Sequence, residues 1–428
     1  MTFFLTNGET NKQSNRRLVL DQIRQRNDLS RSDLVRLTGL SKATVSAIVA
    51  ELMETGLVQE TGSQGAAGVG SVAAGNGVGR PRISLSLVPD ANFVLGAELT
   101  AEECRVVLTN LSAEPVKQLV RPIETSDLSV NPLLQILIAC VNEVTAAVDP
   151  ARILALGVCV PGIVDAAAGL VTLSVVLPWQ NVALAQELRQ HVPFPVAVFS
   201  RGSAATWGER WYGAGREVDN LLYVRVGASI VGGLVLHGQP YLGHTYGAGE
   251  LGHVTVQPNG ALCRCGNHGC LATVATTDAL LSRVRQLLRT DSDNTLWTTM
   301  QHNFDQLTLT DVVNAAHAGN GVAQQALAEI GSWLGVALAS ALNLLNLEMI
   351  IVGGPMALAG EYLLTPLQKE LTQRALPTHF ANLAVVASLL KENAPAVGAA
   401  SLVLHELLSP HQQTIKPALL HRQTAALL

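Results

Sequence analysis

Charged residues are scarce in this chain: Asp, Glu, Lys and Arg make up 14% of its 428 residues and leave a net charge of −5 at pH 7. A protein that coats nucleic acid over its whole surface is therefore not expected, although a local basic patch is allowed. Hydrophobic residues make up 48% of the chain. This length and composition predict two or three compact domains with apolar cores, and not a disordered protein.

The chain also lacks a recognisable targeting segment and a set of paired cysteines. Its first nine residues, MTFFLTNGE, contain neither a basic stretch nor a long apolar core, so we expect no signal peptide. Cys104, Cys140 and Cys159 each stand alone among apolar residues and are predicted to be buried thiols. The apolar stretch 330–352 is interrupted by polar side chains and predicts a buried helix followed by a core strand, not a membrane span. Together these features indicate the reducing cytoplasm and no membrane.

Four potential metal ligands stand close together in the middle of the chain. They are one imidazole and three thiols, from His253, Cys263, Cys265 and Cys270. This is the ligand set of a closed structural zinc site, so zinc is the predicted cofactor. Gly266 and Gly269 allow the backbone to turn tightly enough to bring the last two cysteines together. His268 is a competing ligand, but its place inside this turn favours an outward orientation.

The segment 14–60 has the pattern of three helices and the start of a hairpin. A helix is expected over 15–26, and Ser30, with Asp33 three residues later, predicts the start of a short second helix. Gly39 ends that helix and Ser41 caps a third one, whose inward stripe contains Val45, Ile48, Val49 and Leu52. This order is the helix-turn-helix arrangement.

The third helix would read DNA. Its outward face near the N-terminus presents Lys42, Ala43, Thr44 and Ser46. Small side chains permit close approach to the major groove, and a lysine there can reach a phosphate or a guanine. Strands are expected over 57–60 and 82–87, so the module is predicted to be a winged helix.

A Gly- and Ala-rich stretch at 61–79 has the composition of an extended wing or a flexible linker. It ends in Gly-Arg-Pro-Arg, and an extended Gly-Arg-Pro segment can place Arg80, with Arg82 beside it, in the narrow minor groove of A·T-rich DNA. An ordinary loop arginine is the alternative interpretation.

Residues 247–270 resemble the signature of the ROK family (repressors, open reading frames and sugar kinases), in which Gly-Glu-x-Gly-His leads into a Cys-x-Cys-Gly-x-x-Gly-Cys zinc loop. Other features of the family extend from about residue 90 to about residue 405. The resemblance implies an α/β body with the actin-like ATPase architecture, in which two lobes flank a cleft. It also implies that a winged helix precedes the body in ROK repressors, whereas ROK kinases begin directly with the sugar-kinase fold.

These observations divide the chain into six parts. We expect an N-terminal arm (1–13), a winged helix-turn-helix domain (14–88), a first lobe (89–205), a second lobe with the zinc loop (206–393), a helix that returns to the first lobe (394–408) and a tail (409–428).

The phosphate loop and catalytic base of ROK kinases are both replaced in this chain. The kinases' Asp-x-Gly-Gly-Thr-Lys turn, whose glycine amides wrap the ATP phosphates, corresponds here to Glu98, Thr100, Ala101 and Glu102. Glu102 adds a negative charge where a polyphosphate would lie. Arg201 stands where the kinases have the aspartate that takes the proton from the sugar hydroxyl, and arginine cannot act as that base. We therefore expect no phosphoryl transfer and no enzyme activity.

The resemblance implies that the sugar site is retained only in part. Gly162, Glu250 and His253 match family positions on the sugar-binding path, and zinc would fix the ring of His253 by taking one nitrogen. The asparagine, Asn-Asp pair and glutamate of the family are replaced by Val176, Ser200-Arg201 and Ala272. Each lost partner leaves a sugar hydroxyl unpaired at about 1–3 kcal/mol, so weak binding of a neutral hexose is expected. Arg201 suggests an anionic or altered ligand, and the alternative is that no small molecule binds.

The sequence thus predicts a DNA-binding transcriptional regulator, expected to be a repressor of carbohydrate-related genes. It would bind double-stranded operator DNA as a homodimer or higher homo-oligomer, with a degenerate sugar-kinase body as its effector or dimerisation domain. Two alternatives remain open: a ROK sugar kinase with an appended domain, and a regulator that binds no ligand.

Overall fold

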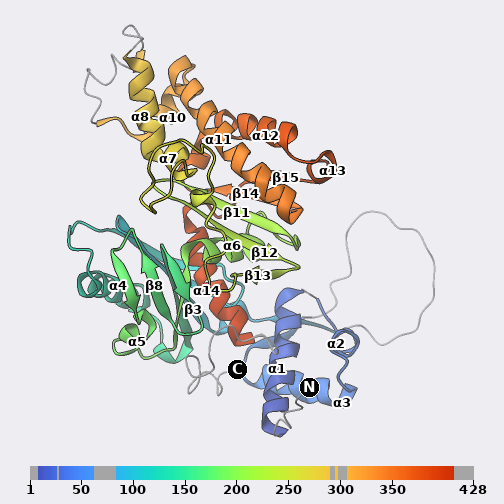
Figure 1. The fold of residues 1–428 in the computed structure, drawn as a ribbon. Coiled ribbons are helices and arrows are strands. Elements are labelled where there is room, and N and C mark those ends of the chain that lie inside the picture. Colours follow the sequence, from blue (N-terminus) through green and yellow to red (C-terminus); the bar gives the residue numbers. More distant parts are fainter. Residues whose placement is uncertain (1–7, 27, 62–82, 290–294, 297–305, 409–428) are drawn as a thin grey trace.

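A computed structural model describes residues 8–26, 28–61, 83–289, 295–296 and 306–408. A small N-terminal head is followed by a body built on two five-stranded sheets, as Figure 1 shows. Arg80, Arg82 and nearly all of the expected wing at 61–79 lie outside the described residues, as does the expected tail.

The head contains three helices and a two-stranded sheet: α1 (Gly8–Gln25), α2 (Arg31–Thr38), α3 (Lys42–Glu54), β1 (Val58–Thr61) and β2 (Ser84–Leu87). The first helix begins at Gly8 and not at Asn15, so the arm expected over 1–13 is wrong from Gly8 onward. The caps predicted for the second and third helices are confirmed. Ser30 and Asp33 form a capping box, Gly39 ends α2 in the left-handed conformation at φ 70°, and Ser41 caps α3. The antiparallel pair β1–β2 completes a winged helix.

The first lobe contains a five-stranded sheet in the order β10-β6-β3-β4-β5. Its strands are β3 (Phe93–Leu99), β4 (Glu103–Asn110), β5 (Pro115–Pro122), β6 (Ile153–Val160) and β10 (Val196–Ser200). Helices α4 (Val130–Thr145) and α5 (Leu184–Arg189) pack on this lobe, together with a small sheet of β7 (Ile163–Asp165), β8 (Leu170–Ser174) and β9 (Trp179–Val182). Both β3 and β6 are buried along their whole length, so β6 reads as a continuous apolar run in the sequence and β3 does so except at Glu98.

The second lobe has its own sheet, in the order β13-β12-β11-β14-β15. The strands are β11 (Leu221–Val226), β12 (Ile230–Leu236), β13 (Gln239–Tyr241), β14 (Met349–Gly353) and β15 (Ala384–Ala387). Its helices are α7 (Ala272–Ala275), α8 (Thr277–Leu288), α10 (Leu309–His317), α11 (Gly321–Leu345), α12 (Glu361–Arg374) and α13 (Pro377–Phe380). Among the described residues α11 alone is long and apolar enough to cross a membrane, but half of its most apolar window is buried inside the protein, as in a core helix.

Two helices join the parts of the molecule. Helix α6 (Arg201–Tyr212) spans the boundary expected at 205, and it packs on both β12 and α14 (Ala394–Leu408). The crossing of α6 and α14 is close, because a side chain on Gly208 would meet the Ala394 carbonyl oxygen at 2.8 Å and one on Gly398 would meet the Ala204 carbonyl oxygen at 1.7 Å. Helix α14 also packs on β3 and β6, as expected for a helix returning to the first lobe.

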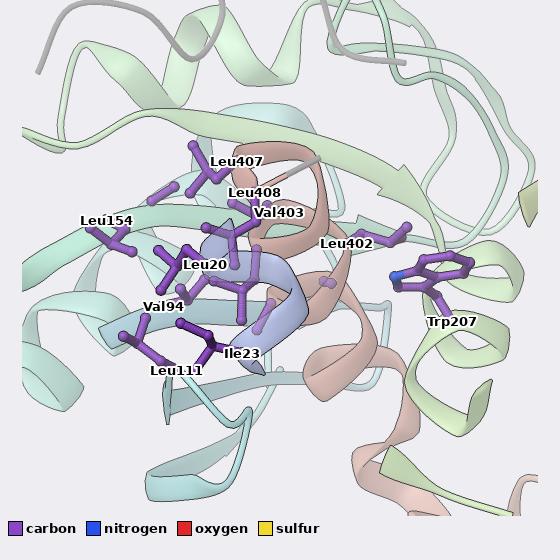
Figure 2. Packing of buried hydrophobic residues seen from close by; sticks show 14 of the residues in the cluster. Leu20, Ile23, Val94, Leu111, Leu154, Trp207, Leu402, Val403, Leu407 and Leu408 are labelled. Carbon is purple, nitrogen blue, oxygen red and sulfur yellow. The ribbon is translucent and has the colours of Figure 1, made fainter. Parts of the chain in front are cut away.

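The head is attached to the body by a shared apolar core. Leu20 and Ile23 of α1 are buried in one cluster with Leu402 and Val403 of α14 and with Trp207 of α6 (Figure 2). Fully burying an aliphatic side chain of this size contributes about 1.5–3 kcal/mol. The winged helix is therefore packed against the body and is not simply tethered to it.

Candidate functional sites: a metal cluster, a closed cleft and a reading helix

The four expected metal ligands converge in the structure. The ligand atoms of His253, Cys263, Cys265 and Cys270 all lie within 4.8 Å of one another. Cys263 Sγ is 3.7 Å from His253 Nδ1, and the sulfur atoms of Cys265 and Cys270 are also 3.7 Å apart. A tetrahedral zinc with Zn–S bonds of about 2.3 Å separates neighbouring sulfurs by about 3.8 Å. The cluster can therefore hold a metal ion such as zinc.

The local backbone explains this convergence. Gly269 has a φ of 69°, and a side chain there would meet the Gln257 carbonyl oxygen at 1.5 Å, so only glycine fits. Gly266, at φ 90°, makes the second sharp turn. The backbone N–H of Asn267 lowers the pKa of the exposed Cys265 to about 7, which favours the thiolate that metals bind. His268 is exposed and its Nδ1 donates to the Gly260 carbonyl oxygen, so the competing ligand points away.

The ring of His253 connects the metal cluster to a carboxylate. Its Nδ1 faces the cysteines, while its Nε2 lies 4.0 Å from Glu250 Oε2. Burial raises the pKa of Glu250, and His253 opposes that shift. A metal on Nδ1 would thus fix the ring and leave Nε2 beside Glu250, an arrangement able to hydrogen-bond a polyhydroxylated ligand.

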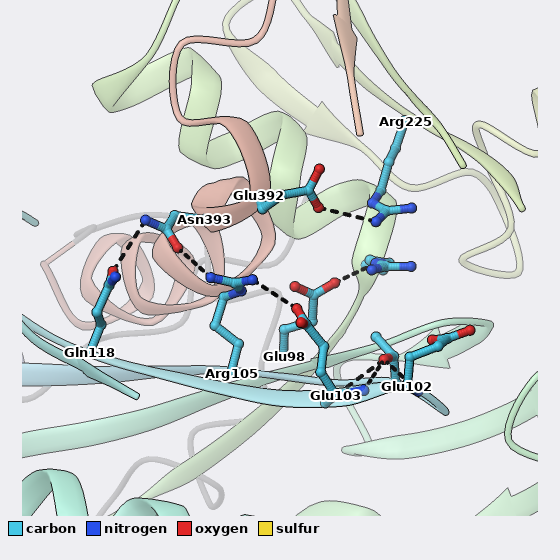
Figure 3. Close-up of polar contacts among 10 residues, drawn as sticks. Glu98, Glu102, Glu103, Arg105, Gln118, Arg225, Glu392 and Asn393 are labelled. Carbon is cyan, nitrogen blue, oxygen red and sulfur yellow. Dashed lines mark hydrogen bonds and ion pairs between the residues drawn. The ribbon is translucent and has the colours of Figure 1, made fainter. Parts of the chain in front are cut away.

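Arg201 and Glu98 form a buried ion pair across the first lobe (Figure 3, where Glu98 is labelled). Arg201 Nε contacts Glu98 Oε1, with the two side chains 10% and 1% exposed. Burial opposes the charge on Arg201, but Glu98 raises its pKa further, so the guanidinium stays protonated. The positive charge of Arg201, at the position of the kinase base, is therefore neutralised by Glu98, at the position of the phosphate loop. The hypothesis that Arg201 awaits an anionic ligand is not needed, because its counter-ion is internal.

A short turn between β15 and α14 links the two lobes. Glu392 accepts from Arg225 of β11 at 3.2 Å, while the neighbouring Asn393 accepts from Arg105 of β4 at 2.9 Å and donates to Gln118 of β5 at 3.2 Å (Figure 3). One turn thus contacts the sheets of both lobes, so a change in the lobe angle must strain or break these bonds.

A cavity of about 710 Å³ lies beside the zinc loop. Its walls include Val176 and Ala272, the positions where ROK kinases have asparagine and glutamate, together with Ser229, Arg283 and Trp333. Of the four residues expected to bind an effector, only His253 lines this space; Gly162, Glu250 and Arg201 do not. The structure therefore does not gather the expected effector residues around one cavity.

The reading face of α3 is accessible. Lys42 and Ala43 are exposed and Thr44 and Ser46 are partly exposed, while the opposite stripe is buried. Ser41 Oγ accepts from the Thr44 backbone N–H at 3.1 Å and lies 2.8 Å from its hydroxyl, which holds the first turn in place. The four α3 residues expected to contact DNA thus share one solvent-facing surface, whereas the other two, Arg80 and Arg82, lie outside the described residues.

Three features of these sites were not anticipated. They are the Glu98–Arg201 pair, the link through Glu392 and Asn393, and the cavity beside the zinc loop. A signal existed for the first one: Glu98 interrupts an apolar strand, and a buried carboxylate requires a cationic partner. The sequence gives no comparable signal for the other two.

Comparison with known proteins agrees with this geometry. The ROK family model matches residues 95–406, and a MarR family model matches residues 15–67. A xylose repressor from Caldicellulosiruptor bescii is 30% identical over 93% of this chain and 97% of its own length. A crystal structure of a ROK family transcriptional regulator, a homologue of the E. coli Mlc protein, has a TM-score of 0.80 at 26% identity and covers 95% of this chain and 99% of its own.

A ROK family glucokinase from Streptomyces griseus, solved with glucose and AMPPNP, has a TM-score of 0.67 at 25% identity. It covers 73% of this chain and 99% of its own length, so the likeness to this kinase leaves over a quarter of the chain unmatched. The curated repressor, in contrast, matches nearly end to end. This chain belongs to the ROK family and carries a winged helix ahead of the family's two-lobed α/β body.

Proposed function

We propose that this chain is a cytoplasmic transcriptional repressor of sugar-utilisation genes, in which the winged helix binds operator DNA and the ROK body senses an effector and forms the homo-oligomer. The observation that carries this proposal is the buried Glu98–Arg201 pair, which occupies both kinase positions in a body fused to an exposed reading helix. Because Arg201 stands where the kinases have their base and Glu98 is held in its ion pair, neither residue can take the proton from a sugar hydroxyl. The likeness to a xylose repressor along nearly the whole chain supports the same function.

In this proposal α3 enters the major groove with Lys42, Ala43, Thr44 and Ser46 against the bases and phosphates. Arg80 and Arg82 would follow the backbone into the adjacent minor groove. A two-fold symmetric dimer would place two such helices about one DNA turn, or a multiple of it, apart. Because the chain is acidic overall, specific affinity must come from these two reading faces acting together.

Replacing Ala43 by glutamate should weaken operator binding at least about tenfold, because a carboxylate would face the phosphates at a position that needs a small side chain. The matched control is Ala381→Glu, which adds the same charge at an exposed position of the second lobe. Fluorescence anisotropy with a selected DNA fragment measures both affinities. Equal losses for the two variants would show that total charge, and not the α3 face, controls binding.

The effector is proposed to be a sugar or sugar derivative bound near Gly162, Glu250 and His253, of which His253 also lines the cavity beside the zinc loop. Glu250 and the free Nε2 of His253 offer adjacent hydrogen-bonding groups, and the nearby cavity provides room. Val176 and Ala272 make the wall apolar where kinases bind hydroxyls, which favours a ligand with fewer hydroxyl groups than a hexose.

Isothermal titration with xylose, glucose, sugar acids and sugar phosphates tests this site. We expect one class to bind and to lower DNA affinity, and we expect Glu250→Gln to weaken that binding by about 1–3 kcal/mol. An exposed matched control is Glu217→Gln, on the turn after α6. A flat response to every compound would favour a regulator that binds no ligand.

Zinc is proposed as a structural ion. The three thiolates and one imidazole leave no open coordination position for substrate, which is typical of structural sites. Its role would be to hold the zinc loop and the ring of His253 in place beside the cleft.

A further inference from the structure

Helix α6 extends from the buried Glu98–Arg201 pair to the DNA-binding head. Its first residue, Arg201, forms the buried pair with Glu98, and its last residues, Trp211 and Tyr212, contact Arg24 of α1. Twelve residues of α helix span about 18 Å. One continuous helix therefore connects the degenerate kinase site to the winged helix.

Arg24 is the polar centre of the contact between head and body. Its side chain is 5% exposed and forms an ion pair with Asp21 at 2.8 Å. It also donates to the Tyr212 hydroxyl at 3.0 Å, and its guanidinium lies 4.7 Å from the centre of the Trp211 ring. A planar guanidinium can satisfy all of these contacts at once, whereas a lysine ammonium cannot. The orientation of α1 on α6 is therefore specified by Arg24 and not by apolar contact alone.

Helix α6 has little freedom to move independently of its neighbours. A side chain at Gly202 would meet the Gly232 carbonyl oxygen of β12 at 2.0 Å, and one at Gly208 would meet the Gly398 Cα of α14 at 3.0 Å. The ring of His405 in α14 packs against the ring of Trp207, with the ring centres 4.8 Å apart and the planes tilted by 60°. Because α6 is packed this closely, a displacement of its first residues is expected to move the whole helix, and not to be taken up by local side-chain rearrangement.

We propose that Arg24 is the positioning residue that couples the Glu98–Arg201 end of α6 to the DNA-binding head, so that a change in the cleft alters operator affinity through this helix. The inference rests on the proposed function, because its principal readout is DNA binding. Arg24 itself touches no DNA in this scheme; it fixes the orientation in which α1, and with it α3, meets the duplex.

A double-mutant cycle tests the coupling. Glu98→Gln perturbs the cleft end, and Arg24→Lys keeps the charge at the head end while losing the combined contacts to Tyr212 and Trp211. Arg26→Lys, at an exposed arginine just beyond α1, is the matched control. We expect Glu98→Gln to lower affinity for a selected DNA fragment about fivefold in the parent and Arg26→Lys backgrounds, and less than about twofold in the Arg24→Lys background.

An equal effect of Glu98→Gln in all three backgrounds, or no effect in the parent, would overturn the proposal. If Glu98→Gln unfolds the body, the pair Glu98→Gln with Arg201→Met removes both charges and enters the same cycle. Amide hydrogen exchange of α1 is measured in the same variants without DNA. Glu98→Gln should increase exchange in α1 only in the proteins that keep Arg24. A parent protein without DNA preference would contradict the proposed function, while the exchange data would still decide the coupling.

Discussion

Arg201→Ala should lower the free energy of unfolding of the body by about 3–5 kcal/mol, because it leaves the carboxylate of Glu98 buried without a counter-ion. Both side chains are almost fully enclosed, so water cannot replace the lost partner. Unfolding in urea, followed by circular dichroism, measures the change. The effect should be far larger than that of Arg216→Ala, at an exposed arginine in the turn after α6.

Removing both charges should be much less damaging than removing one. The double variant Glu98→Gln with Arg201→Met leaves an uncharged, hydrogen-bonding glutamine and an apolar side chain in the same space, so most of the loss should be recovered. If the single and double variants were equally unstable, side-chain packing and not charge compensation would account for the requirement. That result would also weaken the argument that the kinase site is closed by an ion pair.

Cys265→Ser should release the metal and lower the melting temperature of the body. Structural zinc binding is coupled to folding, and its apparent binding free energy in small zinc domains is about 10–16 kcal/mol. In a large body, only the part of this free energy that stabilises the zinc loop would be lost. Elemental analysis should find about one zinc per parent chain and a large loss in the variant. Calorimetry gives the melting temperature.

His268→Ala is the control for this experiment. It lies in the same turn as the ligands but is exposed and bonded to Gly260, so metal content and melting should be unchanged. The assignment of ligands would be contradicted if Cys265→Ser retained its metal. It would also be contradicted if Cys265→Ser and His268→Ala lost the same amount of metal.

The features that could be predicted from the sequence depend on residues close together in the chain. The zinc ligands lie between His253 and Cys270, and the glycines that set their geometry are among them. The caps at Ser30 and Ser41 act on backbone groups three residues away, so helix-turn-helix boundaries follow from local chemistry. The start of α1 at Gly8 was missed, because its first eight residues, GETNKQSN, contain no apolar side chain and so show no helical periodicity.

The features that could not be predicted join distant segments. Arg201 and Glu98 are 103 positions apart, and Arg24 and Tyr212 are 188 positions apart. Composition and periodicity show that each of these residues must find a partner or solvent, but not which partner it finds. For Arg201 this led to the hypothesis of an external anion, whereas the structure supplies an internal carboxylate.

The central claim is that an inherited sugar-kinase body now serves a DNA-binding head. The most direct test is to incubate the purified protein with fragments of its own genome and with random duplex of equal length, and to sequence what is retained at physiological salt. The account predicts strong enrichment of a few fragments that share an inverted repeat and lie beside sugar-utilisation genes. Retention of genomic and random duplex to the same extent would contradict it.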